Sequence, residues 1–143
     1  MKQDARTENS AEAKTEAVRS MQRILRERAS DPILTPEDVS AAVNYSPRHA
    51  ERLFRELTGK SIAQYLRLVR LTGSAERLLG TQDAVVDIAL DAGFDSHEGF
   101  SRAFFRSFRV LPGAYRRDPL PIPLFLQFPA DGARLLRQKQ KET

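Results

Sequence analysis

The sequence repeats itself at a constant offset of fifty residues. The run Y-S-P-R-H-A-E-R-L-F-R at 45–55 corresponds to F-D-S-H-E-G-F-S-R-A-F-F-R at 94–106. The matching pairs are Ser46 and Ser96, Arg52 and Arg102, Phe54 and Phe104, and Tyr65 and Tyr115. Just upstream the offset is forty-nine, because one residue is inserted at the turn. Two copies of a short helix, a tight turn and a longer, basic helix predict a paired helix-turn-helix, which commonly reads DNA.

Composition limits the class of protein. A chain of 143 residues can form one compact domain or two small subdomains, and it is too short for a typical multidomain enzyme. The pI is about 9.8, and the basic residues are sorted, with five arginines and no acid between Arg102 and Arg117. The absence of cysteine excludes disulfides and thiolate zinc sites. With a polar N-terminus and no apolar stretch near 20 residues, we expect a cytoplasmic, nucleoid-associated protein without a membrane partner.

The first half of the chain predicts one helix-turn-helix. Residues 1–15 lack apolar periodicity and are expected to be disordered or a frayed helix, and 16–117 form the folded module. Thr35 precedes a proline and opens a short helix, which Asn44 ends with a left-handed turn. Ser46 also precedes a proline and opens a longer helix that stops at Gly59. The first helix-turn-helix is therefore placed at 35–59.

A long helix and a second copy follow. The capping box S-I-A-Q opens a linker helix at 61–79, whose roughly 18 residues at about 1.5 Å each give about 27 Å, comparable to one turn of B-DNA. The second helix-turn-helix is placed at 83–109, with Asp83 and Ser96 as helix caps and Gly93 at the turn. Prolines then predict an extended tail or linker at 118–143. The expected fold is all-α, with about seven helices and two helix-turn-helix subdomains joined by the long helix.

The repeat also resembles a known family. The run G-F-D-S-H-E-G-F-S-R-A-F-F-R-S-F-R-V-L-P-G-A-Y-R-R at 93–117 is similar to the motif of AraC/XylS-type transcriptional regulators. The likeness extends over 16–117, through R-L-T-G-S-A-E-R-L-L at 70–79 and the first helix-turn-helix. It implies a monomeric module whose two recognition helices enter adjacent major grooves of double-stranded DNA. Arg109 stands where the family often has glycine, and Leu111 where it often has serine.

The resemblance also assigns site residues. It implies that seven side chains face bases, namely Arg48, Glu51, Arg52, His97, Glu98, Ser101 and Arg102. Phosphate contacts are expected from Ser46, Arg55, Lys60, Ser96, Arg106 and Arg116. Many related regulators carry a fused effector-binding domain. The chain is then either a fragment of a longer regulator that lacks this domain or a stand-alone reader.

Residue chemistry refines these assignments. A guanidinium can bond guanine O6 and N7 together, so Arg52 and Arg102 are expected to contact guanines, in preference to lying in solvent or on phosphates. Glu51 and Glu98 either accept from cytosine N4 or orient a neighbouring arginine. A polar line on the linker helix is expected to be solvated or paired internally. Five phenylalanines are expected to form the core, namely Phe54, Phe94, Phe100, Phe104 and Phe108. The polar line is Arg67, Arg70, Ser74 and Arg77.

The function predicted from the sequence is a sequence-specific DNA-binding transcription regulator. An enzyme is disfavoured because the two histidines lie in separate motifs and no phosphate loop or metal spacing occurs, so no catalytic residue, metal or cofactor is assigned. The alternative is a helix-turn-helix used mainly for protein–protein interaction, with RNA polymerase or another regulator as partner.

Overall fold

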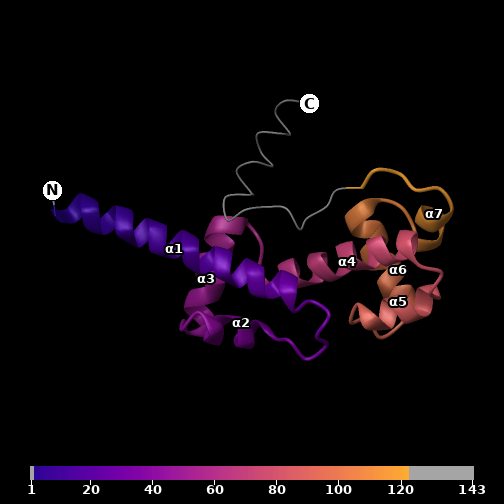
Figure 1. The fold of residues 1–143 in the computed structure, drawn as a ribbon, viewed down its shortest axis with the longest axis horizontal. Coiled ribbons are helices and arrows are strands. Elements are labelled where there is room, and N and C mark those ends of the chain that lie inside the picture. Colours follow the sequence, from indigo (N-terminus) through magenta and orange to yellow (C-terminus); the bar gives the residue numbers. More distant parts are fainter. Residues whose placement is uncertain (1, 123–143) are drawn as a thin grey trace. The chain divides into compact units, whose positions relative to one another are not determined.

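The structure, a computed structural model, describes residues 2–122, and side chains from residue 10 onward. It contains seven α-helices and no strand among the described residues, which confirms the all-α prediction (Figure 1). The helices are α1 (Lys2–Glu27), α2 (Pro36–Ala42), α3 (Pro47–Thr58), α4 (Ile62–Gly80), α5 (Val85–Asp91), α6 (His97–Phe108) and α7 (Pro112–Arg117). The predicted tail lies outside the described residues from 123 onward, and residues 118–122 are irregular.

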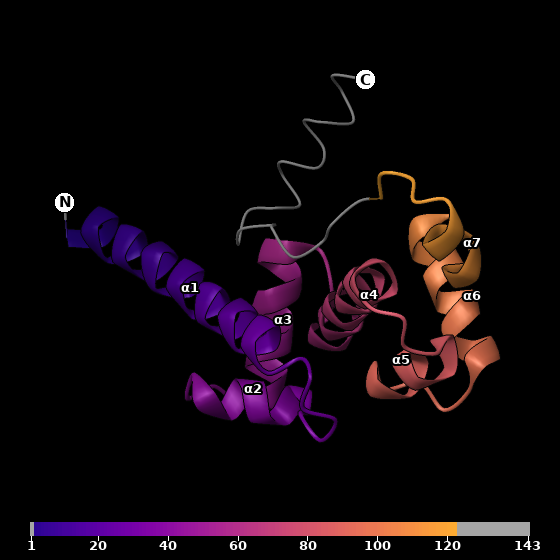
Figure 2. The same ribbon diagram turned by 45° about the vertical axis from the view of Figure 1, so that its right-hand side comes forward.

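The helices divide between two compact units. Among the described residues, the first unit consists of the chain up to Arg28 together with Leu34–Tyr65. The second unit consists of Ala29–Ile33 and the chain from Leu66 onward. Helices α1, α2 and α3 therefore lie in the first unit, and α5, α6 and α7 in the second (Figure 2). Helix α4 begins in the first unit and ends in the second.

Local capping explains where the helices of the first unit begin. The Thr35 hydroxyl accepts from the Asp38 amide at 3.2 Å, and the Asp38 carboxylate accepts from the Thr35 amide at 3.0 Å. The predicted capping box of α4 is also present, with Ser61 and Gln64 bonded to each other's amides at 3.0 and 2.9 Å. Each box satisfies amides that a helix leaves without an intrahelical partner.

The bend between the two helices is the same in both copies. Asn44 has φ 60° and Gly93 has φ 91°, so both are left-handed, as the sequence predicts. In both copies the amide after this residue donates to the carbonyl five residues before that amide. The bonds are Tyr45 N to Ser40 O at 3.0 Å and Phe94 N to Ala89 O at 3.1 Å.

Aromatic side chains form matching cores. Burial repeats residue by residue between 51–60 and 101–110, and Phe54 and Phe104 are both fully buried. Phe54 meets the Tyr65 ring at 5.3 Å between centroids, and Phe104 meets the Tyr115 ring at 5.9 Å. The expected core role of the phenylalanines therefore holds for Phe54, Phe100, Phe104 and Phe108, and Phe94 packs against the core while half-buried.

One helix start, that of α5, differs from the sequence prediction. Helix α1 begins at Lys2, within the segment 1–15 that was expected to be disordered or a frayed helix, and its residues 10–14 are exposed. Asp83 does not cap α5: the N-cap is Ala84, and no side chain bonds there. Asp83 instead accepts from Arg77 Nη2 at 2.8 Å, because a charged partner gives the carboxylate a stronger bond than a backbone amide.

We expect the two buried rings to carry the stability of their units. Phe54→Ala and Phe104→Ala should each lower the free energy of unfolding by about 3–5 kcal/mol, since each removes a buried ring and leaves a cavity. Thermal or urea unfolding followed by circular dichroism measures this loss. Phe105→Ala is the matched control, because this ring is 45% exposed on the same helix as Phe104. Equal melting of all three variants would contradict the assignment.

A second prediction concerns the end of α6. Arg109 is left-handed at φ 62°, where the first copy has Gly59 at φ 76°. Because a left-handed backbone costs a non-glycine residue about 1–2 kcal/mol, Arg109→Gly should stabilise the protein by about 0.5–1 kcal/mol after the entropy of the unfolded chain is counted. A raised urea midpoint with an unchanged slope is the expected result, and Gly59→Arg should shift the midpoint the other way.

Candidate nucleic-acid interface

The outer side of α3 gathers charged residues around an open hollow. Arg48, Glu51, Arg52 and Arg55, here called the α3 face, line this hollow of about 570 Å³ together with Ile62 at the start of α4. Arg48 and Arg52 are exposed, and the Arg55 side chain keeps 64% of its surface. The four positions follow helical spacing opposite the buried residues of α3, so the structure brings together all four residues assigned to this helix.

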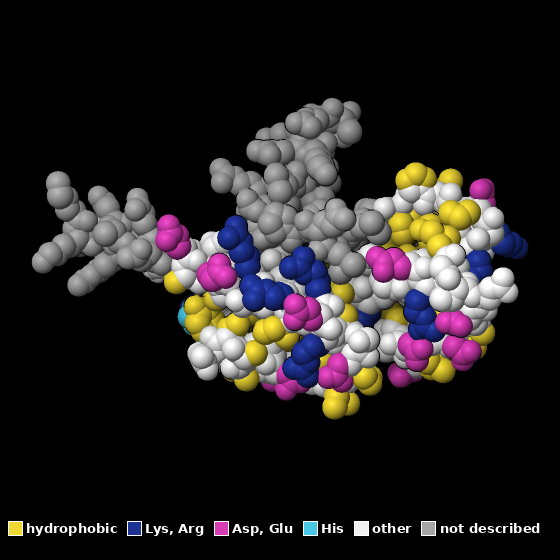
Figure 3. Space-filling model, viewed as in Figure 1, with side chains coloured by type: hydrophobic (Ala, Val, Ile, Leu, Met, Phe, Trp, Pro, Cys, Tyr) yellow, Lys and Arg dark blue, Asp and Glu magenta, His cyan; other side chains and the backbone are white. Residues whose placement is uncertain are grey.

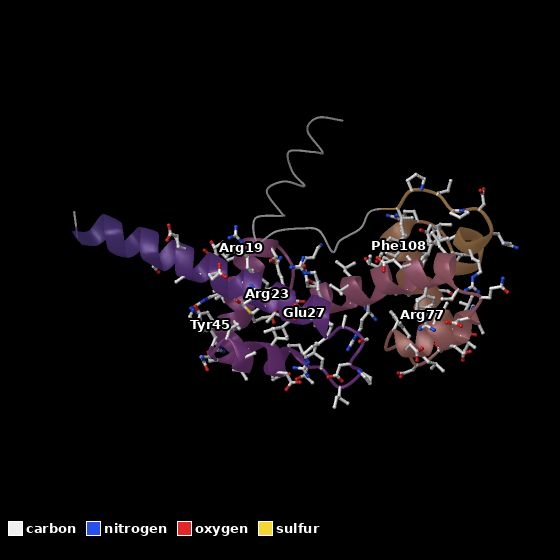
Figure 4. All side chains as sticks on the ribbon, in the orientation of Figure 1. Arg19, Arg23, Glu27, Tyr45, Arg77 and Phe108 are labelled. Carbon is white, nitrogen blue, oxygen red and sulfur yellow. The ribbon has the colours of Figure 1, made fainter. Side chains whose placement is uncertain are left out.

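The start of α3 is fixed by its own sequence. The Ser46 hydroxyl accepts from the His49 amide at 3.2 Å, and Pro47 occupies the first helical position. The Tyr45 ring stacks on the His49 ring at 4.5 Å, at the turn where Figure 4 labels Tyr45. These contacts confirm Ser46 as a helix cap and set the position from which Arg48 and Arg52 project.

Glu51 has a structural partner. Its Oε1 accepts from the Ile62 amide at 3.1 Å and from Arg55 Nε at 3.3 Å. The Ile62 amide is the first of α4 and has no acceptor within its own helix. The carboxylate therefore joins the start of α4 to α3 and holds Arg55, which matches the alternative that a glutamate here orients an arginine.

The outer side of α6 carries the corresponding positions. Glu98, Ser101, Arg102 and Phe105, here called the α6 face, lie fifty residues after the α3 face. Glu98, Arg102 and Phe105 are exposed, Ser101 is half-buried, and His97 and Arg106 are exposed beside them. Ser96 caps α6 as expected, accepting from the Gly99 amide at 3.0 Å. Phe105 was not singled out from the sequence, although the repeat aligns it with the exposed Arg55.

The polar line on α4 is used inside the second unit. Arg70 donates to Ala29 O at 2.9 Å and to Asp31 O at 2.8 Å, and burial lowers its pKa while Asp31 opposes that shift. The Arg67 guanidinium lies 5.3 Å from the centre of the Phe94 ring. Ser74 is buried and donates to Leu71 O at 2.6 Å. These bonds agree with the expectation of internal pairing.

Arg77 closes this line with two ion pairs. Its guanidinium, labelled in Figure 4, bonds Asp83 and Asp91, each at 2.8 Å. It therefore ties α4 to the last residue of α5 and to the segment just before that helix. The hydrogen bond from Arg77 lowers the pKa of the Asp83 carboxyl, and the same bond raises the pKa of Arg77. Both partners are well exposed, so these pairs contribute little to stability but fix orientation.

Arg116, which was assigned to phosphate, has backbone partners, and Lys60 is bonded through its own backbone. Arg116 donates to Leu78 O at 3.0 Å and to Thr81 O at 3.3 Å, which satisfies carbonyls at the end of α4. The Lys60 amide donates to the Thr58 hydroxyl at 3.2 Å, and the residue is half-buried. A phosphate contact by Arg116 would have to coexist with these two bonds.

Basic side chains also gather outside the two faces. Figure 3 shows Lys and Arg side chains over α1, and Figure 4 labels Arg19 and Arg23 there with Glu27 one turn further. All three are exposed, and the mixture of charges is typical of a solvated helix face. No described helix is long and apolar enough to cross a membrane, and no group of three metal-binding side chains occurs among those that the structure describes.

Comparisons with known proteins agree with this geometry. Residues 39–118 match the family model described as "Helix-turn-helix domain". The chain is 42% identical over 89 residues to "Right origin-binding protein" of Escherichia coli K12, covering 62% of this chain and 31% of that protein. It is 36% identical over 86 residues to "Regulatory protein SoxS" of Salmonella typhimurium, covering 60% of this chain and 80% of that protein.

One similar solved structure contains DNA. The DNA-binding domain of AdpA, "the global transcriptional factor, in complex with a target DNA", is 25% identical with a TM-score of 0.60. The match covers 71% of this chain and 98% of that one. By contrast, the matched part spans about a third of the length of the Escherichia coli relative, at 31%.

The two copies offer a matched test of Glu51. Glu51→Ala should lower the free energy of unfolding by about 1–2 kcal/mol, because the Ile62 amide loses its acceptor. Ser101→Ala should be nearly neutral, since the residue matching Ile62 is Pro112, which has no amide hydrogen to satisfy. Urea unfolding of the two variants measures the difference. Equal stability of both variants would show that the Glu51 bond is not needed.

Proposed function

Because the chain belongs to the AraC-type family of helix-turn-helix proteins, we propose that it is a sequence-specific DNA-binding transcription regulator. The observation that carries this proposal is the repeat of one exposed arginine, Arg52 and Arg102, at the same position of two faces built alike. The fold needs neither guanidinium for its core. A guanidinium in the major groove can bond guanine O6 and N7 together.

The other site residues take supporting roles in the proposal. Arg48, His97, Glu98 and Ser101 lie beside these arginines and read neighbouring base edges, while Glu51 acts through Arg55. The capped helix starts at Ser46 and Ser96 present amide groups to phosphates. Arg55, Lys60, Arg106 and Arg116 add charge for the backbone of the duplex.

The proposed activity requires no catalysis and no cofactor. One chain supplies both reading helices, so the module binds as a monomer, with α3 and α6 entering adjacent major grooves. Its place of action is the chromosome, in the cytoplasm. Contact with RNA polymerase and a fused effector-binding domain belong to the same proposal for the whole regulator. The TM-score to a DNA-bound domain supports the DNA partner.

The test separates base reading from charge. A preferred duplex is first selected from a random pool, and binding is followed by fluorescence anisotropy at several salt concentrations. Arg52→Ala and Arg102→Ala should each weaken binding to the selected duplex by about 5- to 150-fold, corresponding to about 1–3 kcal/mol, and change binding to a scrambled duplex far less. Affinity should fall steeply with salt, because phosphate contacts release counterions.

Arg19→Ala is the control for charge alone, since Arg19 is equally cationic and exposed but lies on α1. It should leave the discrimination between duplexes unchanged. Equal losses on selected and scrambled duplexes for Arg52→Ala and Arg102→Ala would defeat the proposed base contacts. A salt-independent affinity would defeat DNA binding itself and favour a protein partner.

A further inference from the structure

The two faces differ at three of their four matched positions: Glu98 takes the place of Arg48, and the other two positions lie one helical turn apart. Ser101 takes the place of Glu51, and Phe105 takes the place of Arg55. The substitution converts an ion pair into a hydroxyl beside an aromatic ring. The arginine between them is retained, as Arg52 and Arg102.

The change follows from the start of the next helix. In the first copy, the Ile62 amide needs an acceptor, Glu51 supplies it, and the same carboxylate holds Arg55. In the second copy Pro112 begins α7 and has no amide hydrogen, so the acceptor has no structural purpose. The side chains at 101 and 105 are therefore not needed to hold the start of the next helix. These two side chains of the α6 face can then be used to contact a binding partner.

Phe105 is the unusual side chain on this face. It is 45% exposed, whereas Phe100 and Phe104 are fully buried. It lies three residues after Arg102 and four after Ser101, which places the three on one side of α6. The matching residue of the first copy, Arg55, lines the hollow of the α3 face with Arg52, so this position belongs to the same surface as the repeated arginine.

We propose that Phe105 contacts the C5-methyl group of a thymine in the major groove, next to the base pair that Arg102 contacts. This inference rests on the proposed function and adds a specificity residue to it. The thymine methyl is the apolar group that the major-groove edges display, and phenylalanine is a side chain suited to it. The two helices thus read different chemistry: the α3 face reads through cations, and the α6 face pairs one cation with an apolar contact.

Replacing thymine by deoxyuridine tests the contact directly, because uracil keeps every hydrogen bond and lacks only the methyl group. Each thymine of the selected duplex is replaced in turn, and affinity is measured for the unmodified chain and for Phe105→Ala. One position should weaken binding of the unmodified chain by about fourfold, the value expected for one buried methyl group. At that position Phe105→Ala should bind the thymine and uracil duplexes equally, and Phe105→Leu should retain part of the preference.

Leu79→Ala is the matched control, since Leu79 is 49% exposed and lies on α4. It should keep the full thymine preference, and the circular dichroism melt of every variant should match that of the unmodified chain. A thymine preference that persists in Phe105→Ala, or one absent from the unmodified chain, would overturn the inference and point to a protein partner for the exposed ring. Failure of the proposed function is distinguishable, because selected and scrambled duplexes would then bind equally.

Discussion

Each outer face takes its direction from one left-handed residue. Helices of seven and twelve residues, as in α2 with α3 and α5 with α6, are too short to be stable alone, so the bend and the core must hold them together. Asn44 and Gly93 turn the chain so that the amide after each bonds back into the preceding helix. With that angle set, Phe54 and Phe104 reach the core and the arginines of the same helices remain outside.

Most helix boundaries could be predicted because their causes are local. The caps at Thr35, Ser46 and Ser96 each join a side chain to an amide three residues later, a distance that the sequence displays directly. Asp83 obeys the same local pattern and yet fails to cap. Its partner, Arg77, lies on another helix, and its position there depends on how α4 packs beside α5. A charged partner supplied by the tertiary fold outcompetes a neighbouring amide, and no spacing rule reveals it.

In the candidate site, too, some features could be predicted from the sequence and others depend on tertiary packing. Periodicity places the expected residues on the outer sides of α3 and α6, and the structure has them there. Periodicity could not show that Glu51 accepts from the first amide of α4. A comparison of the two copies gives a signal for this bond, because the residue that needs an acceptor, Ile62, is replaced by Pro112 where the glutamate is absent. The repeat does separate Phe105 from Phe104, since it aligns Phe104 with Phe54 and Phe105 with Arg55. The fold adds that the Phe104 ring is fully buried and that the Phe105 ring is 45% exposed.

Arg70 has a consequence for how the chain can be divided. Its two bonds hold Ala29 and Asp31, so a short loop preceding α2 belongs to the second unit although its flanking helices belong to the first. Within residues 2–122 the polypeptide consequently crosses between the units three times, at residues 28/29, 33/34 and 65/66. Cleavage within α4 before Arg70 would therefore not separate the two units cleanly. The N-terminal fragment would still carry residues 29–33 of the second unit, and the C-terminal fragment would lack them.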